Sequence, residues 1–378
     1  WFEGHDYAYT KTLTLPEGFD AFELELEGVY HNAEVYVNGQ KALYRPNGYT
    51  CFHGDITSLL HRGENEIRVI ARNADQPNSR WYTGTGIYRP VWLYGGKGQY
   101  ILLNSLRIRT LSIGETARIA LRADTRLLGD VTFDIRDPEG SLVGSFSGKS
   151  GAVLEADIPA ARLWSPATPF LYTCTARTGD DEVTETFGIR TLSWGKKGIL
   201  LNGERVIVQG ACIHHDQGIL GARCYAQGEE RRVRLLKENG YNAVRSAHNP
   251  CSKALLDACD RLGMLMMDEY IDHWYIHKTE YDYVPYFEKW WKQDMADMVD
   301  KDYNHPCVIL YSTGNEVSET AQKKGIQLTR ELTEYLHSLD NTRPVTCGIN
   351  IFFNFLSSIG FGVYSDEKAK KEAEKAEK

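Results

Sequence analysis

Short runs of alternating apolar and polar residues fill the first part of the chain, which is the pattern of β-strands with one buried face. Residues 22–27 alternate Phe or Leu with Glu, and residues 67–69 repeat the alternation. Asn38-Gly39 follows another apolar run and is a strong signal for a hairpin turn. Such turn signals recur about every ten residues, as in a β-sandwich. We therefore predict a first sandwich over residues 1–97, with the glutamates of residues 22–27 facing solvent.

A second all-β unit is predicted over residues 98–190. Residues 131–135 alternate apolar and polar side chains and are followed by the turn sequence Asp-Pro-Glu-Gly. A further strand is expected at residues 170–176. A length of about 90 residues is typical of an immunoglobulin-like sandwich, which is the fold predicted here.

From residue 191 on, short apolar runs alternate with amphipathic segments. Five strands are predicted, at residues 206–213, 243–247, 264–268, 308–311 and 344–348. Leu255, Cys259 and Leu262 share one helical face, and Gly263 is placed to end that helix. Strands and helices in alternation predict a parallel sheet, either doubly wound or part of a (β/α)8 barrel. The charged segment 366–378 is predicted to be a solvated helix.

Composition and charge exclude several classes of protein. The chain has 378 residues, of which 42% are hydrophobic, so packed cores are expected. The net charge of −8 argues against a nucleic-acid-binding protein. No apolar stretch reaches the roughly 20 residues that a membrane helix needs, so no membrane association is expected. The eight cysteines include no Cys-x-x-Cys pair and indicate buried, reduced thiols in a cytoplasmic protein.

Polar residues follow four of the five predicted strands. In a parallel α/β barrel the catalytic groups lie where the strands end. A lone histidine at such a position is more often a satisfied core residue than a ligand. Adjacent histidines could hold zinc, but their side chains diverge on a strand, so no metal site is predicted. Four clusters together favour a functional site: His214-His215-Asp216, Arg245 with His248-Asn249, Asp268-Glu269 and Asn315-Glu316.

Glu316 is the strongest catalytic candidate. Its carboxyl group follows an apolar strand and the side-chain amide of Asn315. Burial would raise the pKa of such a carboxyl, which could then act as a general acid near neutral pH. Asn315 could donate a hydrogen bond to a sugar hydroxyl. The alternative is that Glu316 only begins a helix, where a negative charge is favourable.

Three segments carry a family resemblance. Residues 242–250, Asn-Ala-Val-Arg-Ser-Ala-His-Asn-Pro, resemble one signature of glycoside hydrolase family 2, and residues 302–316 resemble its acid/base signature. Residues 81–89, Trp-Tyr-Thr-Gly-Thr-Gly-Ile-Tyr-Arg, are similar to the loop that ends the sugar-binding domain of that family. The resemblance extends to about residue 350. It implies a jelly-roll sandwich, an immunoglobulin-like sandwich and, over residues 191–378, a partial TIM barrel.

The resemblance also implies roles for individual residues. Members of the family retain the anomeric configuration and use two glutamates, of which Glu316 matches the general acid/base. Asn315 matches the residue that holds the sugar 2-hydroxyl. Two histidines match contacts to the glycone, and two charged residues match positions on the pocket floor: His214, His248, Asp216 and Arg245. Asp268 and Glu269 match strand three, as supports of the pocket or as substrate contacts.

Two departures from the family pattern change the expectations. Metal-dependent β-galactosidases carry a Glu-x-His pair after strand three, where this chain has Asp-His-Trp at residues 272–274. That branch is therefore disfavoured, and no metal or other cofactor is expected to be required. The family nucleophile ends strand seven, whereas every glutamate after Ser365 lies in the charged segment. We expect the sequence to be incomplete at both ends, with the nucleophile beyond residue 378.

These observations favour a retaining exo-β-glycosidase that is active only together with the missing C-terminal part. Its substrates would be carbohydrates or glycoconjugates that end in β-D-glucuronide, the preferred glycone, or in β-D-galactoside. An inactive carbohydrate-binding relative is the alternative, but such a protein would have no reason to keep Asn315-Glu316. A third hypothesis, an interaction protein built of sandwich modules, leaves the polar strand ends unexplained. A homo-oligomer is compatible with the sequence.

Overall fold

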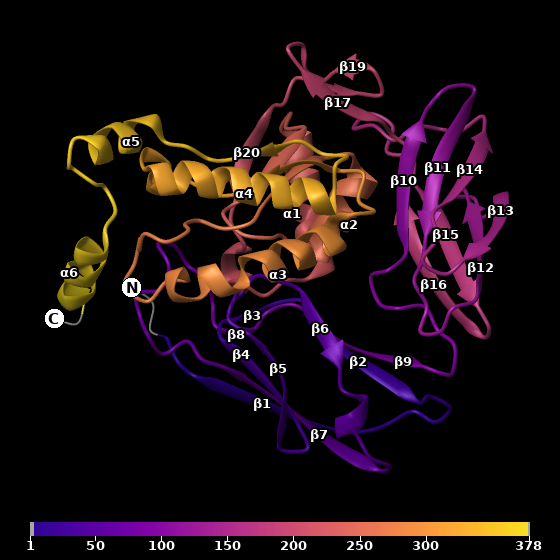
Figure 1. The fold of residues 1–378 in the computed structure, drawn as a ribbon, viewed down its shortest axis with the longest axis horizontal. Helices are drawn as coiled ribbons and strands as arrows, with labels where there is room; N and C mark the ends of the chain where they lie inside the picture. Colours follow the sequence, from indigo (N-terminus) through magenta and orange to yellow (C-terminus); the bar gives the residue numbers. More distant parts are fainter. Residues whose placement is uncertain (1–3, 377–378) are drawn as a thin grey trace.

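The computed structural model describes residues 4–376 and consists of three parts (Figure 1). The ends of the predicted first sandwich and of the charged segment, positions 1–3 and 377–378, lie outside the described residues. The N-terminal sandwich occupies the lower part of the view, the immunoglobulin-like sandwich its right side, and the helices and parallel strands its centre.

Two antiparallel sheets form the N-terminal sandwich, with strand orders β1-β7-β4-β5 and β6-β2-β9, beside a short β3–β8 pair. The predicted hairpin lies between β4 and β5, where Asn38 and Gly39 both have positive φ angles, of 49° and 78°. The strands are β1 (Tyr7–Thr14), β2 (Ala21–Leu26), β3 (Val29–Tyr30), β4 (Ala33–Val37), β5 (Gln40–Arg45), β6 (Phe52–Asp55), β7 (Glu64–Ala71), β8 (Gly86–Ile87) and β9 (Val91–Gly96).

The predicted solvent-facing side is wrong for two glutamates, one in β2 and one directly after it. Glu25 and Glu27 are buried, although they alternate with the core leucines as expected. The Nζ atom of Lys253, in the central part, donates to both carboxylate oxygens of Glu25, at 2.8 and 2.9 Å. Trp92 Nε1 donates to Glu27 at 2.7 Å. The second face of this strand is therefore covered by another part of the chain, which alternation alone cannot reveal.

The immunoglobulin-like sandwich pairs a sheet of order β10-β11-β14 with one of order β13-β12-β15-β16. Its core is apolar and includes the predicted alternating positions Val131, Phe133 and Ile135. The strands are β10 (Arg107–Ser112), β11 (Thr116–Arg122), β12 (Asp130–Arg136), β13 (Leu142–Lys149), β14 (Leu154–Pro159), β15 (Tyr172–Thr178) and β16 (Asp181–Phe187). A small sheet of β17 (Leu192–Gly195), β18 (Gly198–Leu201) and β19 (Glu204–Arg205) follows.

Five parallel strands, hydrogen-bonded in chain order, form the centre of the third part. They are β20 (Gly210–Ile213), β21 (Ala243–Ser246), β22 (Leu265–Glu269), β23 (Val308–Ser312) and β24 (Val345–Thr346). A doubly wound sheet would reverse its strand order, so this part is a portion of a TIM barrel. All five predicted strands are present. The first is shorter than predicted, because Ile207 and Val208 precede it with exposed side chains.

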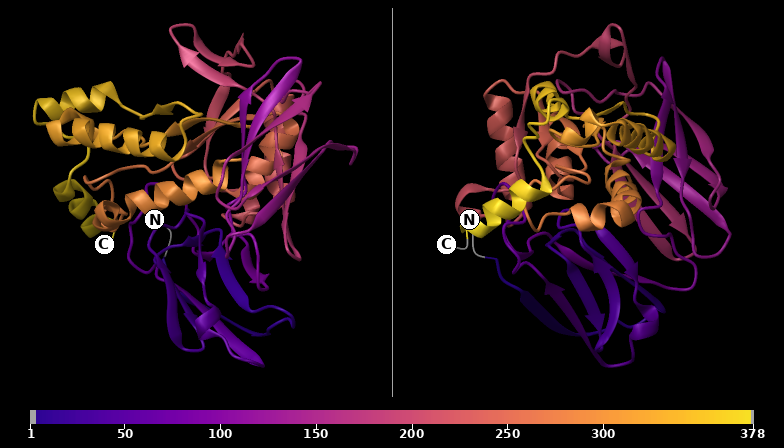
Figure 2. Two further views of the ribbon diagram at one scale, coloured as in Figure 1. Left: turned by 45° about the vertical axis from the view of Figure 1, so that its right-hand side comes forward. Right: turned by 60° about the vertical axis from the view of Figure 1, so that its left-hand side comes forward.

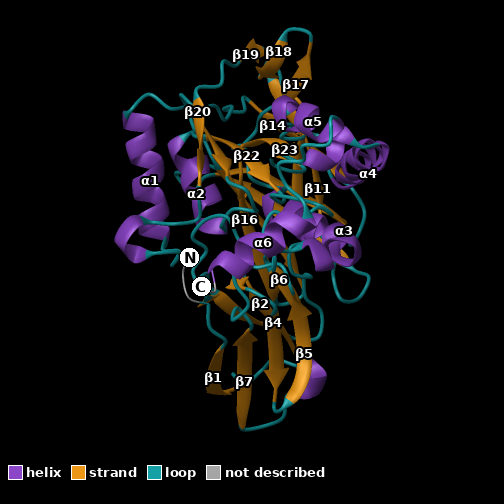
Figure 3. Ribbon diagram, turned by 90° about the vertical axis from the view of Figure 1, so that its left-hand side faces the viewer, coloured by secondary structure: helices purple, strands orange, loops and turns teal. Residues whose placement is uncertain are grey.

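Helices follow these strands one after another around the sheet (Figures 2 and 3). Helix α1 packs on α2, and α3 packs on α4. The α-helices are α1 (Ala226–Glu238), α2 (Lys253–Leu262), α3 (Val284–Asp302), α4 (Lys323–Leu339), α5 (Ile351–Ser358) and α6 (Asp366–Ala376). Short 3-10 turns lie at Thr57–Leu59, Gly218–Leu220 and Ser318–Ala321. No helix of residues 4–376 has the length and apolar character to cross a membrane.

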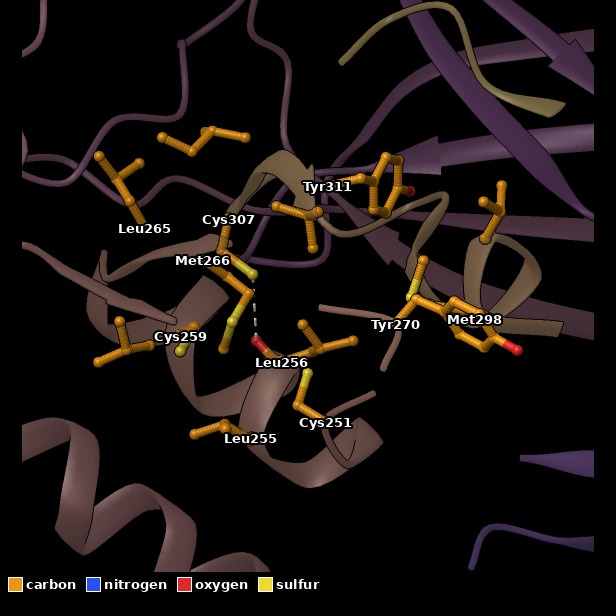
Figure 4. Close-up of a cluster of buried hydrophobic side chains, with 14 of the residues drawn as sticks. Cys251, Leu255, Leu256, Cys259, Leu265, Met266, Tyr270, Met298, Cys307 and Tyr311 are labelled. Carbon is orange, nitrogen blue, oxygen red and sulfur yellow. Dashed lines mark hydrogen bonds between the residues drawn. The ribbon is translucent and has the colours of Figure 1, made fainter. Parts of the chain in front are cut away.

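Helix α2 shows how the sequence sets its own ends. The Ser252 side chain caps the first turn by accepting from the Leu255 backbone N–H at 3.1 Å. Gly263 ends the helix in the left-handed conformation at φ 71°, as predicted. Leu255 and Cys259 enter a buried cluster with side chains of β22 and β23, drawn in Figure 4.

Six of the eight cysteines are buried, and none is in a disulfide. Cys212, on β20, is exposed and Cys347 is partly buried, so the prediction of buried thiols is wrong for Cys212. The charged segment forms α6 as predicted, but it is not fully solvated. Ala369 and Ala373 on one of its faces are buried.

Buried charged groups join the N-terminal sandwich to the barrel portion. Arg45 of β5 bridges two carboxylates of α3, Asp294 at 2.9 Å and Asp297 at 2.7 Å. Arg89 donates to the Pro250 carbonyl at 2.9 Å. Pulling the two parts apart would expose or unpair these charges, so they hold each other in one arrangement.

His305, within the predicted acid/base signature, has a structural role. Its Nδ1 atom lies 2.6 Å from Asp260 Oδ2, and the other oxygen of that carboxylate accepts from the Cys307 backbone N–H at 2.9 Å. Burial alone would lower the pKa of His305, but the neighbouring carboxylate of Asp260 raises it above the ordinary histidine value. The pair links the end of α2 to the start of β23.

This raised pKa predicts how stability depends on pH. The ion pair stabilises the fold fully below about pH 6.5, where unfolded histidine is also protonated, and the stabilisation is lost as the pH rises through the raised pKa. The wild type should therefore lose its advantage over His305→Gln between pH 6 and pH 10. Urea unfolding of both proteins across this range measures the difference. An equal difference at both ends would contradict the assignment.

Candidate active site

A buried carboxylate organises the C-terminal ends of the parallel strands. Glu269, at the end of β22, is fully buried. Its Oε2 accepts from Arg245 Nη2 at 2.6 Å and from Ser312 Oγ at 2.6 Å, and its Oε1 lies 2.7 Å from His248 Nδ1. Glu269 thus fixes the side chains of Arg245 and His248. Of the two roles that the family resemblance left open, support of the pocket and substrate contact, its burial and bonds match the first.

The amide of Asn315 is held at both ends. Its Oδ1 accepts from Arg245 Nη2 at 2.9 Å, and its Nδ2 donates to Asp272 Oδ1 at 2.9 Å. These two bonds determine which way the amide faces, because reversing it would place donor against donor. Each amide atom keeps capacity for one further hydrogen bond, which a ligand hydroxyl can fill.

Asp272 pairs with two cationic side chains from different parts of the chain. Arg80, in the loop between β7 and β8 of the N-terminal sandwich, donates to its two oxygens at 3.1 and 2.6 Å. Lys278 Nζ donates to Oδ1 at 3.0 Å and also to the Asn315 carbonyl at 2.7 Å. Burial alone would raise the pKa of Asp272, but these cations hold it well below the ordinary value. Asp272 is therefore an anion that supports Asn315.

Glu316 lies beside this network with its carboxylate accessible. Its Oε1 accepts from Asn350 Nδ2 at 3.1 Å, and its Oε2 is 3.6 Å from Arg80 Nη1. The side chain is 36% exposed and thus only partly buried among the described residues. The residue has a φ of 45°, an unfavourable backbone conformation for a residue with a Cβ, and such residues concentrate at functional sites.

The strained backbone at Glu316 is fixed from both sides. On one side, Lys278 binds the Asn315 carbonyl. On the other, the Val317 N–H donates to the Gly348 carbonyl at 3.3 Å, and the Gly348 N–H donates to the Gly314 carbonyl at 2.7 Å. These bonds hold the carboxyl group at one place on the rim of the site.

Three rings form a second wall of the site. Trp81 lies 5.1 Å, centroid to centroid, from both His214 and His248, and the two histidines are 5.4 Å apart. Burial and the neighbouring His248 lower the pKa of His214, so its ring is neutral at pH 7. The ring of the adjacent His215 instead lies 4.9 Å from that of Tyr49 in the N-terminal sandwich, tilted by 44°, and its Nε2 is 3.1 Å from the Asn249 carbonyl oxygen. The two neighbouring histidines therefore face different parts of the protein.

Two of the predicted polar residues lie outside this cluster. Asp216 is exposed and has no hydrogen bond or ion pair within residues 4–376. Asp268 is fully buried and accepts from Ser246 Oγ at 2.7 Å and Lys301 Nζ at 2.9 Å. The structure thus brings Arg245, His214, His248, Asn315 and Glu316 together, and places Asp216 at the surface and Asp268 in the core.

Sequence reasoning from strand ends missed several residues of the site. They are Arg80, Trp81, Asp272, Lys278, Asn350 and Tyr364, whose hydroxyl accepts from Arg80 at 2.7 Å. Trp81 and Asp272 lay in segments that the sequence did single out, one as a family loop and one only for metal binding. Arg80 and Tyr364 carried no local signal, because they reach the site from outside the parallel strands.

Three family models account for nearly the whole chain. The model described as "Glycosyl hydrolase 2 galactose-binding domain-like" matches residues 1–92, and "Glycosyl hydrolases family 2" matches residues 103–190. The model "Glycosyl hydrolases family 2, TIM barrel domain" matches residues 194–377.

Characterised relatives and solved structures agree with these matches. A β-galactosidase of Bacteroides ovatus is 36% identical over 90% of this chain and 47% of its own length. The crystal structure of a family 2 member from Bacteroides cellulosilyticus superposes with a TM-score of 0.85 at 35% identity, over 93% of this chain and 49% of its own. A Bacteroides uniformis β-glucuronidase, solved with a covalently bound cyclophellitol-6-carboxylate aziridine, gives a TM-score of 0.80 at 26% identity, over 95% and 48%. The chain spans about half the length of each of these proteins.

Proposed function

This chain belongs to glycoside hydrolase family 2, and on that premise we propose that it provides the acid/base half of a retaining exo-β-glycosidase site. One observation carries the proposal. An accessible carboxylate, Glu316, stands next to an amide whose orientation is fixed by Arg245 and Asp272. The wall of Trp81, His214 and His248 lies at the same end of the strands and offers apolar ring surface and imidazole nitrogens to a sugar ring.

The proposed reaction has two steps. In the first, the Glu316 carboxyl donates its proton to the glycosidic oxygen while a second carboxylate attacks the anomeric carbon and the aglycone leaves. In the second, Glu316 accepts a proton from water, which attacks the anomeric carbon and releases the nucleophile carboxylate. As the family resemblance implies, Asn315 would bind the 2-hydroxyl of the glycone throughout, and each of its amide atoms has capacity for one further hydrogen bond.

The second carboxylate is proposed to come from a part of the protein outside residues 1–378. Glu269 and Asp272 are the carboxylates nearest to this network by their bonds, and both are buried and fully engaged with cations or hydroxyl groups. Neither is free to attack an anomeric carbon. The relatives of this chain are about twice its length, which leaves room for a further carboxylate in each of them.

Residues 1–378 alone are accordingly expected to show no glycosidase turnover. A retaining mechanism needs two carboxyl groups roughly 5–5.5 Å apart. Of the three carboxylates described in this network, Glu316 is accessible and both Glu269 and Asp272 are buried. Fluorogenic β-glucuronide and β-galactoside assays of the purified chain test this. Hydrolysis that disappears in Glu316→Gln would show that the nucleophile is already present and would refute this part of the proposal.

The glycone is proposed to be a β-D-glucuronide or a β-D-galactoside. Relatives named for each activity resemble this chain, so the resemblance does not choose between them. The deciding experiment is a panel of aryl β-D-glycosides, including glucosides and mannosides, assayed on a polypeptide with the complete barrel. Saturable turnover of either proposed glycone supports the proposal. Binding without turnover of any member would favour the inactive carbohydrate-binding relative.

Removing either imidazole of the ring wall should impair this activity strongly. We expect His214→Ala and His248→Ala each to lower kcat/KM by on the order of 10²-fold, because the ring contacts are made in the transition state. His337→Ala, at an exposed position in the last turn of α4, is the matched control for catalysis. Steady-state kinetics of the three variants at matched folded fractions give the comparison. A loss of kcat/KM in His337→Ala as large as that in His214→Ala would contradict the placement of the wall.

A further inference from the structure

A polar cavity of about 310 Å³ lies between the immunoglobulin-like sandwich and the barrel portion. It is at the end of the parallel strands opposite to Glu316, because residues just before β23 and β24 line it. Three arginines line the cavity, and no aspartate or glutamate does. They are Arg109, Arg190 and Arg343. A cavity of this size falls at the lower end of the range for small-molecule sites.

Arg190 is a buried cation without a carboxylate partner. It is 9% exposed and makes no ion pair within residues 4–376. Its Nε donates to the Pro306 carbonyl at 2.8 Å and its Nη2 to the Val308 carbonyl at 2.7 Å, whereas Nη1 has no hydrogen-bond partner among the described residues. Burial and the neighbouring Arg343 lower the pKa of Arg190 to about 9. An uncompensated buried charge is costly, so a counter-ion would be bound favourably.

The other two arginines differ from each other. Arg343 is neutralised, since it pairs with Asp340 at 2.6 Å and donates to the Val308 carbonyl at 2.8 Å. Arg109 projects from β10 with an exposed side chain and has no ion pair or hydrogen bond in the described part of the chain. Among residues 4–376, the cavity therefore has two guanidinium groups without a direct ion pair, Arg190 buried and Arg109 exposed.

We propose that this cavity binds a small molecule through an oxyanion group, such as a phosphate, sulfate or carboxylate. The anion bridges Arg190 Nη1 and the guanidinium of Arg109, which suit oxyanions in charge and in donor geometry. Trp194, also in the lining and 46% exposed, offers a ring face for the rest of the ligand. The site is separate from the proposed glycosidase function and does not depend on it.

A purely structural role explains only part of the geometry. Arg190 does hold the two sandwich-facing carbonyls at the start of β23, which accounts for Nε and Nη2. This structural role explains neither why Arg190 Nη1 has no hydrogen-bond partner in the described residues nor why no acidic residue lines the cavity. The backbone of Arg109 belongs to the β10–β11 pairing, but its guanidinium makes no hydrogen bond or ion pair in the described residues, so no structural role of that group is shown.

Isothermal titration of the purified chain tests the proposal. The probes are inorganic phosphate and glucose 6-phosphate at constant ionic strength, with glucose as the neutral control. Arg109→Gln should weaken binding at least about tenfold. Arg231→Gln, which removes an exposed arginine of α1 outside the cavity lining, should leave it unchanged. Tighter binding of the sugar phosphate than of phosphate would identify an anionic sugar as the preferred form, and the reverse would identify the free ion.

Arg109 is chosen because its side chain is exposed and its replacement should leave the fold intact. Loss of Arg190 would break its hydrogen bonds to the Pro306 and Val308 carbonyls, where the immunoglobulin-like sandwich meets the barrel portion. Arg190→Lys is the second variant: it keeps the positive charge but loses the planar fork, and should also weaken binding. No saturable binding of either probe would overturn the proposal. So would equal affinities of the wild type and Arg109→Gln.

Discussion

Glu316→Gln is expected to lower the hydrolysis of β-glycosides with poor leaving groups by roughly 10²–10⁴-fold in a polypeptide with the complete barrel. Glutamine has nearly the shape of glutamate and can still accept from Asn350, but it cannot protonate the glycosidic oxygen. Substrates with good leaving groups do not need that proton. They should keep a fast first step and accumulate the covalent glycosyl-enzyme, because the second step lacks its base.

Rescue by azide distinguishes the loss of the acid/base group from a general disruption of the active site. A small anionic nucleophile needs no base, so azide should restore turnover in Glu316→Gln and yield a glycosyl azide of retained configuration. Glu334→Gln, at an exposed position on α4, is the matched control and should behave as the wild type. If the mutant hydrolysed a poor-leaving-group substrate at the wild-type rate, Glu316 would not be the acid/base.

Asp272→Asn should cost about 3–5 kcal/mol of unfolding free energy, which is the range for breaking a buried ion pair. The buried Lys278 would lose its carboxylate, and Arg80 would lose the anion that anchors it. The same change should reduce turnover, because Asn315 would face another amide where it now donates to a carboxylate. Urea unfolding and aryl glycoside kinetics measure the two effects.

Asp216→Asn makes the identical chemical change at the surface. Because Asp216 is exposed and makes no hydrogen bond or ion pair in the described residues, its replacement should alter stability by less than about 0.5 kcal/mol. If it nevertheless lowered kcat/KM, the predicted substrate contact of Asp216 would stand despite its exposed position. Equal losses of unfolding free energy in Asp272→Asn and Asp216→Asn would show that the ion pairs of Asp272 with Arg80 and Lys278 contribute little to stability.

The fold was predictable where hydrophobic patterns are complete within one segment. The strands β22 and β23 are buried on both faces, and each is an apolar run, Leu-Met-Met or Val-Ile-Leu-Tyr, that ends in polar residues. In β21 the apolar pair Ala-Val is followed by Arg245 and Ser246. The end of α2 was equally local, since a single glycine in the left-handed region ends it. For the same reason the strand-end rule found Arg245, His248, Asn315 and Glu316.

What failed depended on contacts between distant segments. Glu25 looks solvent-facing in its own strand and is buried only because Lys253 covers it. Arg80 and Asp272 are 192 positions apart, and nothing near either one indicates the other. A hydrophobic pattern describes one segment of the sequence at a time, whereas burial and ion pairing depend on how all segments pack together in the folded chain.

The Arg80–Asp272 contact has a consequence for the ancestry and engineering of such proteins. A side chain from the N-terminal sandwich completes the hydrogen bonding of a barrel residue that orients Asn315. The N-terminal sandwich is therefore not an independent module, and replacing it by recombination would change the contacts of a barrel residue. A chimera that joins a foreign sandwich to this barrel would inherit an unmatched Asp272, unless the donor loop brought an arginine to the same place. Substitutions at these two positions should accordingly be inherited as a pair.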